Sequence, residues 1–254
     1  MAIATRLLDR TVIVTGAGSG IGAAIARRMH EEGAYVACID VDRERTETIT
    51  RDLGERALAI HADVTDQAAV MGAVDTARNW RGRLDVVVNN AGIAGPQTPA
   101  GSTDLGEWER TISVNLTGTF LVSKYAIEHL VSARGCIVNV ASALAMIGWR
   151  RESAYGPGKA GVVQFTKSMA LDYAPDVRVN CVCPGAVRTP MIESVLPRDG
   201  DTAALLREYG KVHPLYRRLA EPSEIADAVL FLASDDASLV TGAALLVDAG
   251  FTAG

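Results

Sequence analysis

The residues TGAGSGIG at 15–22 constrain the fold more than any other stretch of this chain. They stand between an apolar run at 11–15 and a helical pattern that carries Ile21, Ile25 and Met29. Glycine permits positive φ and, because it has no Cβ, lets another group approach the backbone closely. The free N–H groups and the positive dipole end of a helix that begins here would face the turn, which favours a phosphate. The stretch therefore predicts a phosphate-binding strand, turn and helix.

Six more apolar runs follow, most of them separated by helical patterns. The predicted strands are 11–15, 35–39, 57–61, 84–89, 135–142, 177–183 and 244–250. The predicted helices include a first one that ends at 32, then 43–53, 67–80, 111–130, 154–173 and 222–232. Nearly continuous apolar strands are typical of a sheet that helices cover on both faces. We expect an α/β fold of the Rossmann type, a doubly wound parallel sheet of about seven strands. No linker divides the chain, so 1–254 should form a single dinucleotide-binding and catalytic domain.

Charge and composition exclude several classes of partner. The net charge is −5 and no basic groove is evident, which argues against nucleic acid and against an anionic membrane. The first residues lack the apolar core of a signal peptide, so we expect a cytoplasmic protein. The cysteines are interpreted as buried free thiols, and no Cys or His cluster indicates a metal site.

A carboxylate placed after the second predicted strand indicates which dinucleotide is bound. Gly18-x-Gly20-x-x-Ala23 fits the dinucleotide fingerprint, and Asp40 lies 20 residues after Gly20. Its carboxylate can accept hydrogen bonds from the adenosine ribose, whereas it would repel a 2′-phosphate. We therefore predict NAD rather than NADP, and only the nearby Arg43 argues the other way.

A tyrosine and a lysine four residues apart form the candidate catalytic pair. Tyr155 and Lys159 share one face of a helix, where an ammonium favours the phenolate, and Ser142 ends the strand before them. Gly-Pro-Gly at 156–158 separates the pair. Since proline is tolerated only in the first turn, the helix must begin close to Ala154, with Ser153 as a suitable cap.

These motifs occur together in one order and spacing, and on them the chain resembles the short-chain dehydrogenase/reductase family over essentially its full length. The residues that carry the resemblance are TGAGSGIG at 15–22, Asp63-Val64, NNAG at 89–92, Asn115 in SVNLTG, Ser142 in IVNVAS, Tyr155 and Lys159 in YGPGK, and Pro184-Gly185 ahead of Thr189. On local grounds alone, Asp63 could instead cap a helix and 89–90 could be a plain turn.

The resemblance implies a role for each position. Tyr155 would take the proton of an alcohol hydroxyl while hydride passes to the nicotinamide, and Ser142 would orient the oxygen. Lys159 would lower the phenol pKa and bind the nicotinamide ribose, and Asn115 would anchor a water through which protons leave. The implied cofactor-binding residues are Gly16, Ser19, Gly20, Ile21, Gly22, Asp40, Asp63, Val64, Asn90, Gly92, Tyr155, Lys159, Pro184, Gly185, Val187 and Thr189. A homotetramer that pairs through the helices at 111–130 and 154–173 is implied as well.

The segments around the predicted catalytic residues suggest the substrate. Apolar and aromatic residues there predict a pocket for a mid-sized hydrophobic secondary alcohol or ketone; they are Leu144, Met146, Trp149, Met191 and Val195. Arg150 and Arg151 could clamp an acidic group, although a solvated pair is the preferred interpretation. Residues 189–213 have the mixed composition of a substrate lid.

Two other functions remain open at this point. One is an NADP-dependent ketoreductase in a biosynthetic pathway, which Asp40 opposes. The other is a non-catalytic sensor or scaffold that binds NAD. A protein without turnover would be free to lose Ser142, Tyr155 or Lys159, and all three are present.

Overall fold

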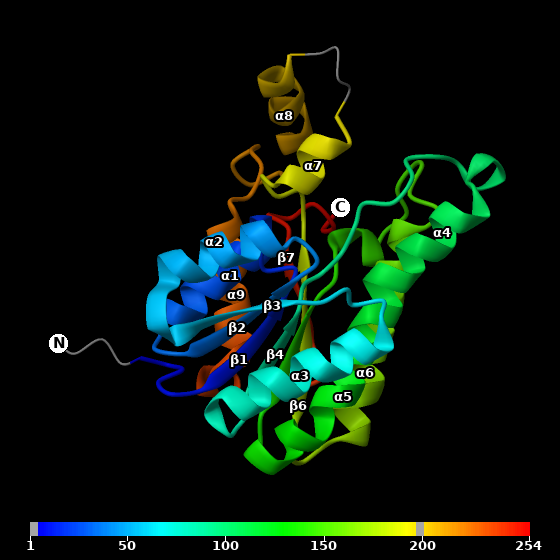
Figure 1. Ribbon diagram of the computed structural model, residues 1–254. Helices are drawn as coiled ribbons and strands as arrows, with labels where there is room; N and C mark the ends of the chain where they lie inside the picture. The colour runs from blue at the N-terminus through cyan, green and yellow to red at the C-terminus, as the bar shows by residue number, and fades with distance from the viewer. Residues whose placement is uncertain (1–4, 197–200) are drawn as a thin grey trace.

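A computed structural model describes residues 5–196 and 201–254 of the protein, and seven parallel strands form its centre (Figure 1). The order across the sheet is β3-β2-β1-β4-β5-β6-β7. The strands are β1 (Thr11–Thr15), β2 (Tyr35–Asp40), β3 (Ala57–His61), β4 (Val86–Asn89), β5 (Cys136–Val140), β6 (Arg178–Pro184) and β7 (Ala244–Val247). All seven predicted strands are confirmed, and the chain order reverses direction across the sheet between β1 and β4.

Helices cover both faces of the sheet, as the apolar strands predicted. Val12 and Val14 pack with α1 and α9 on one face, whereas Ile13 packs with α3, α5 and α6 on the other (Figure 1). The α-helices are α1 (Gly20–Glu31), α2 (Arg43–Leu53), α3 (Gln67–Arg81), α4 (Leu105–Ile112), α5 (Gly118–Ala133), α6 (Tyr155–Asp172), α7 (Pro190–Ser194), α8 (Thr202–Gly210) and α9 (Pro222–Ala233). None of the described helices is long and apolar enough to cross a membrane.

The single helix predicted at 111–130 is wrong in its extent and in its geometry. The helical segment begins at Leu105, where the Asp104 side chain accepts a hydrogen bond from the backbone N–H of Glu107 at 3.1 Å. A π-helical segment, Ser113–Thr117, then joins α4 to α5. Leu105, Trp108 and Ile112 stand at helical spacing, so the sequence did carry a signal for this first part, and the prediction missed it.

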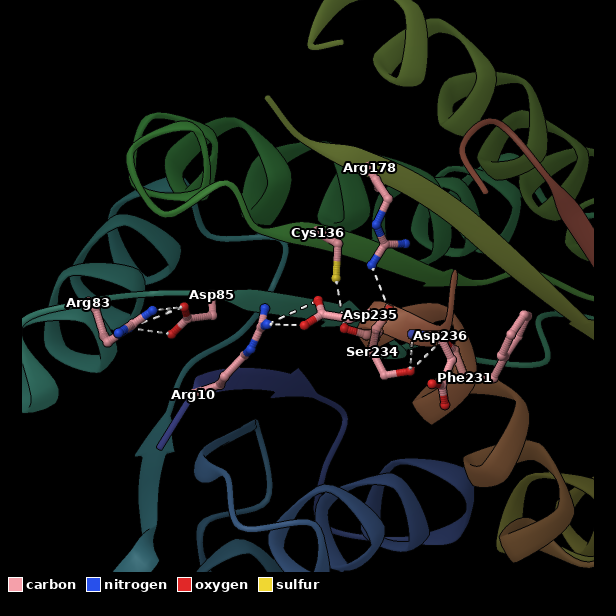
Figure 2. A network of polar contacts seen from close by, with 10 residues as sticks. Arg10, Arg83, Asp85, Cys136, Arg178, Phe231, Ser234, Asp235 and Asp236 are labelled. Carbon is pink, nitrogen blue, oxygen red and sulfur yellow. Dashed lines mark hydrogen bonds and ion pairs between the residues drawn. The ribbon is translucent and has the colours of Figure 1, made fainter. Parts of the chain in front are cut away.

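A network of charged side chains lies at the amino ends of the central strands (Figure 2). The predicted site lies at the carboxyl ends of the same strands. Asp85 is almost fully buried; it accepts a hydrogen bond from the backbone N–H of Thr11 at 2.9 Å and pairs with Arg83. Arg10 pairs with the exposed Asp235 at 2.8 Å. The Asp85 carboxylate thus ties the start of β1 to the residue before β4.

We expect Asp85→Ala to lower the free energy of unfolding by about 2 to 3 kcal/mol, because the buried N–H of Thr11 loses its acceptor. Asp235→Ala is the matched control, since it removes a carboxylate from an exposed pair and should cost less than about 1 kcal/mol. Urea denaturation measures both values. Equal losses in the two variants would contradict the role given to Asp85.

Candidate active site

A pocket of about 610 Å³ opens at the carboxyl ends of the strands. The loops after β1, β2, β4, β5 and β6 all contribute to its wall. The predicted residues that line it are Gly16, Ser19, Gly20, Ile21, Asp40, Asp63, Val64, Asn90, Gly92, Ser142, Tyr155, Lys159, Pro184, Gly185, Val187 and Thr189. Gly22 and Asn115 lie beneath this wall instead of in it. The tertiary structure therefore brings the separate motifs to one cavity.

Close backbone packing explains the glycines of the first turn. Gly16 has a φ of +65°, and a Cβ there would lie 2.8 Å from the Cα of Ala91. A Cβ on Gly22 would lie 2.0 Å from the carbonyl oxygen of Gly16. The side chain of Asn90 donates hydrogen bonds to the carbonyl oxygens of Thr15 at 2.9 Å and Gly16 at 3.1 Å. The turn is thus held against the end of β4, and Asn90 is more than part of a plain turn.

The amino end of α1 fits a phosphate group. Ser19 is the N-cap residue, and its side chain makes no capping hydrogen bond, while no acidic residue stands in the first turn. The free N–H groups and the positive helix end therefore face the pocket with an unused hydroxyl beside them. A Cβ on Gly20, whose φ is +53°, would lie 3.1 Å from Thr189. This cradle fits the pyrophosphate of a dinucleotide.

Asp40 is fixed at the end of β2 with its carboxylate at the pocket wall. One oxygen accepts a hydrogen bond from the N–H of Gly18 at 2.8 Å, and the other accepts from the N–H of Asp42 at 3.0 Å. Arg43 lies 3.9 Å from the carboxylate of Glu47 and forms no ion pair with Asp40 within the described residues. A ligand at this point of the pocket therefore meets a carboxylate.

Asp63 does not cap the helix that follows it. The N-cap of α3 is Asp66, whereas Asp63 accepts hydrogen bonds from the N–H and the hydroxyl of Thr65. Its position in the pocket wall, next to Val64, is consistent with the family-based expectation.

Ser142, Tyr155 and Lys159 meet on one side of the pocket. Ser142 follows β5, and its hydroxyl accepts a hydrogen bond from the N–H of Leu144 at 3.1 Å. Tyr155 opens α6, and the ammonium of Lys159, one turn later, lies 5.8 Å from the centre of its ring. Lys159 donates a hydrogen bond to the carbonyl oxygen of Val140 at 2.8 Å. The three groups are placed to act on one small molecule.

The Gly-Pro-Gly insertion leaves this geometry intact because α6 begins at Tyr155, so that Pro157 falls in its first turn. The cap expected from Ser153 is wrong. The N-cap residue is Ala154, and no side chain caps it. The hydroxyl of Ser153 instead donates to the carbonyl oxygen of Thr98 at 3.1 Å, which fastens another loop to the pocket wall.

Burial controls the ionisation of the two catalytic candidates. It raises the pKa of Tyr155 to about 12, against a smaller opposite effect of the Ser142 hydroxyl. It lowers the pKa of Lys159 to about 8, since a buried ammonium loses its hydration. At neutral pH the tyrosine is therefore a phenol, ready to donate a proton to a ketone oxygen.

Asn115 lies in the π-helical segment and is completely buried. Its side-chain oxygen accepts a hydrogen bond from the N–H of Ile93 at 2.8 Å, and its amide donates to the Ile93 carbonyl at 2.9 Å. It therefore holds the loop after β4 in place from behind the pocket. The role of anchoring a water stays a prediction.

Four of the five predicted substrate-pocket residues line the cavity: Leu144, Trp149, Met191 and Val195. Met146 does not, since it lies half-exposed in a neighbouring depression of the surface. This prediction is wrong because the short turn after Ser142 points Met146 outward. Arg150 and Arg151 are exposed and line no part of this pocket.

The structure adds wall residues that the sequence analysis missed, among them Gln97, Arg110, Glu152, Tyr209 and Phe251. The ring of Phe251 packs edge-on against Trp149, with ring centres 5.4 Å apart. Gln97, Glu152 and Phe251 come from loops and from the C-terminal end, where no periodicity marks them, whereas Arg110 lies on α4 and Tyr209 on α8.

His213 is a further residue that the sequence analysis missed, and it lies behind the pocket wall. It is buried below Gly185, where one ring nitrogen accepts a hydrogen bond from the N–H of Ala186 at 2.9 Å. The other lies 2.6 Å from the carbonyl oxygen of Arg218. His213 therefore fixes the backbone after β6. Of the predicted lid at 189–213, α7 and α8 lie together at the top of Figure 1, and 197–200 fall outside the described residues.

The sequence of this chain is similar to those of known oxidoreductases. A family model described as enoyl-(acyl carrier protein) reductase matches residues 16–252. The chain is 45% identical over 249 residues to cis-4-hydroxycyclohexanecarboxylate dehydrogenase of Sinomonas cyclohexanicum, which covers 96% of this chain and 97% of that protein. It is 39% identical over 253 residues to meso-2,3-butanediol dehydrogenase of Serratia marcescens, and this match covers 98% of this chain and 96% of that protein.

A solved structure is similar as well. The 3-ketoacyl-(acyl-carrier-protein) reductase from Brucella melitensis, complexed with NADH, superposes with a TM-score of 0.90 at 33% identity, covering 97% of this chain and 99% of that chain.

Proposed function

This chain belongs to the short-chain dehydrogenase/reductase family, and on that premise we propose that it transfers hydride between NAD and a mid-sized hydrophobic secondary alcohol or its ketone. The observation that carries the proposal is the meeting of Ser142, Tyr155 and Lys159 beside a cradle for a dinucleotide. The chain is an oxidoreductase, and its similar relatives are dehydrogenases by name.

Tyr155, Ser142 and Lys159 each have a separate role at the carbon that carries the substrate hydroxyl. The nicotinamide, when bound, supplies the acceptor or donor of the hydride. In the oxidation, the phenolate form of Tyr155 takes the hydroxyl proton, and in the reduction the phenol form gives its proton to the carbonyl oxygen. The Ser142 hydroxyl holds the substrate oxygen. The ammonium of Lys159 favours the phenolate and is placed to bind the nicotinamide ribose.

We propose NAD rather than NADP because the fixed carboxylate of Asp40 would repel a 2′-phosphate. The similar Brucella reductase was solved with NADH, which supports this choice. We expect NAD to be favoured over NADP by about 100-fold in kcat/KM, and Asp40→Asn to reduce that ratio at least about tenfold. Asp42→Asn, two residues further on and outside the pocket wall, is the matched control and should keep the ratio. A preference of the unaltered protein for NADP would contradict the proposal.

A panel of aliphatic, aryl, cyclic and acid-bearing secondary alcohols tests the activity itself. Each alcohol is supplied with NAD, and the appearance of reduced nicotinamide is followed by absorbance. Turnover of one class supports the proposal. Silence across the panel, with NADH still bound, would favour the non-catalytic alternative.

The lid and the assembly are also proposals. Met191, Val195 and Tyr209 line one side of the pocket, which supports a role as a lid for the described residues 189–196 and 201–213. Exposed apolar side chains on α5 and α6, Phe120 and Leu171 among them, support a homotetramer that pairs through these helices. Light scattering should then give four times 26.8 kDa, and the mass of one chain would contradict the homotetramer.

The four buried free cysteines fit a reducing cytoplasm, which we propose as the location.

A further inference from the structure

Glu152 is a carboxylate in the substrate end of the pocket that the reaction does not use. It precedes Tyr155 by three residues, and its carbonyl oxygen accepts a hydrogen bond from the N–H of Gly156 at 3.3 Å. The residue lines the main pocket together with Leu144 and Trp149, and the same three residues separate it from the neighbouring depression. A carboxylate therefore stands next to apolar residues at the substrate end of the pocket.

The hydrogen bonding of this carboxylate is incomplete. One oxygen accepts a hydrogen bond from the side chain of Gln97 at 2.8 Å. The other is buried and has no hydrogen-bond partner anywhere in the described chain. A buried polar atom without a partner is costly, so such an atom calls for a group that the protein itself does not supply. The terminal torsion of a glutamate is soft, so a small rotation can present either oxygen to a ligand.

No cation neutralises Glu152 among residues 5–196 and 201–254. Of the nearby positive groups, Lys159 donates to Val140, Arg110 lines the pocket with an exposed side chain, and Arg151 is exposed outside the pocket. Within the described residues, the hydrogen bond from Gln97 is the only polar contact of the Glu152 carboxylate. Burial, opposed by the Gln97 contact, raises the pKa of this carboxyl. In its ionised form, Glu152 presents a second carboxylate in the pocket with a like charge that no ion pair neutralises.

We propose, resting on the proposed dehydrogenase function, that Glu152 selects the substrate: it accepts a hydrogen bond from a second hydroxyl and repels a carboxylate. The favoured substrates are then secondary alcohols with a further hydroxyl on an apolar skeleton, that is, diols. Simple alcohols leave the buried oxygen unpaired, and hydroxy acids add repulsion. Glu152 is thus a specificity-determining residue that takes no part in the proton or hydride transfer.

A matched set of ring substrates tests this selection. The set is cyclohexanol, the 1,2-, 1,3- and 1,4-cyclohexanediols, and the hydroxycyclohexanecarboxylates with the acid at the same ring positions. For each, kcat/KM is measured at saturating NAD. The unaltered protein should prefer its best diol to cyclohexanol by about 10- to 100-fold, the range of a hydrogen bond to a charged group, and should disfavour the matching acid.

Two variants separate the hydrogen bond from the charge. Glu152→Leu removes the acceptor, so the diol-to-cyclohexanol ratio should fall about 10- to 100-fold. Glu152→Gln keeps an acceptor oxygen and can keep the Gln97 contact, so it should retain part of the diol preference and gain activity on the hydroxy acid. Glu109 is an exposed acid of α4 outside the pocket wall, and Glu109→Gln is the control. It should change neither the diol-to-cyclohexanol ratio nor the hydroxy-acid-to-cyclohexanol ratio of kcat/KM.

The outcomes distinguish the selection from the function on which it rests. If cyclohexanol is oxidised and both ratios stay the same in the two variants, Glu152 does not select the substrate. An equal slowing of all three substrate types would assign Glu152 a purely structural role and overturn the proposal as well. Should the Leu variant fail to fold, the Gln variant decides through its ratio for the hydroxy acid. If the unaltered protein oxidises none of the alcohols, this result would instead contradict the dehydrogenase function.

Discussion

Tyr155→Phe loses about 1,000-fold or more in kcat for both alcohol oxidation and ketone reduction, because the variant keeps the buried ring but has no proton to exchange. The hydroxyl of Tyr155 stands at the pocket wall beside Ser142, where the ring itself makes the packing contacts. The measurement is the rate of change in reduced nicotinamide with saturating alcohol or ketone. Binding of NADH, measured by fluorescence, should change little.

Two comparisons make this result specific. Tyr173→Phe, at the other end of α6 and outside the pocket wall, removes the same hydroxyl from a different site and should leave kcat unchanged. In the unaltered protein, burial raises the pKa of Tyr155, so oxidation should accelerate as the pH rises while reduction slows. A Tyr155→Phe variant with more than about a tenth of the original kcat would refute its role as acid and base.

Gly22→Ala should lower the free energy of unfolding by about 3 kcal/mol and weaken NADH binding at least about tenfold. The added Cβ would lie 2.0 Å from the carbonyl oxygen of Gly16 and 2.5 Å from the side-chain nitrogen of Asn90. Neither neighbour can retreat easily, because the first is backbone and the second is held by Thr15 and Gly16. The clash therefore moves the turn that cradles the phosphates.

Gly72→Ala is the matched control for Gly22→Ala. Gly72 lies within α3, and a Cβ there meets nothing within 4 Å. Alanine is the better helix former by about 1 kcal/mol, so this variant should be as stable as the original protein or more so. Thermal unfolding with and without NADH compares the two. If both substitutions shift the unfolding midpoint equally, helix propensity and not the Gly16 contact explains the loss.

Much of the site was predictable because its signals are local. The glycine turn, Asp40 at the end of the next strand, and the four-residue spacing of Tyr155 and Lys159 each depend on neighbours in the sequence. The structure places all of them in one pocket. Pro157 alone predicted a start of α6 close to Ala154, and the helix begins one residue later, at Tyr155. Ser153 shows the limit of this reasoning, since a residue suited to cap a helix instead bonds to Thr98, which is far away in sequence.

The sequence by itself determined the strands, their covered faces and the residues that end them, because apolar periodicity and glycine chemistry act over a few neighbouring positions. Only the tertiary structure decided what surrounds the substrate. Gln97 meets Glu152 across 55 residues of chain, Phe251 reaches Trp149 from the C-terminal end, and His213 supports Gly185 from below. Such contacts depend on how distant loops close over one edge of the sheet, and no local pattern encodes that closure. The reaction could therefore be predicted from the family resemblance that these local motifs carry, whereas the residues that surround the substrate are known only from the folded protein.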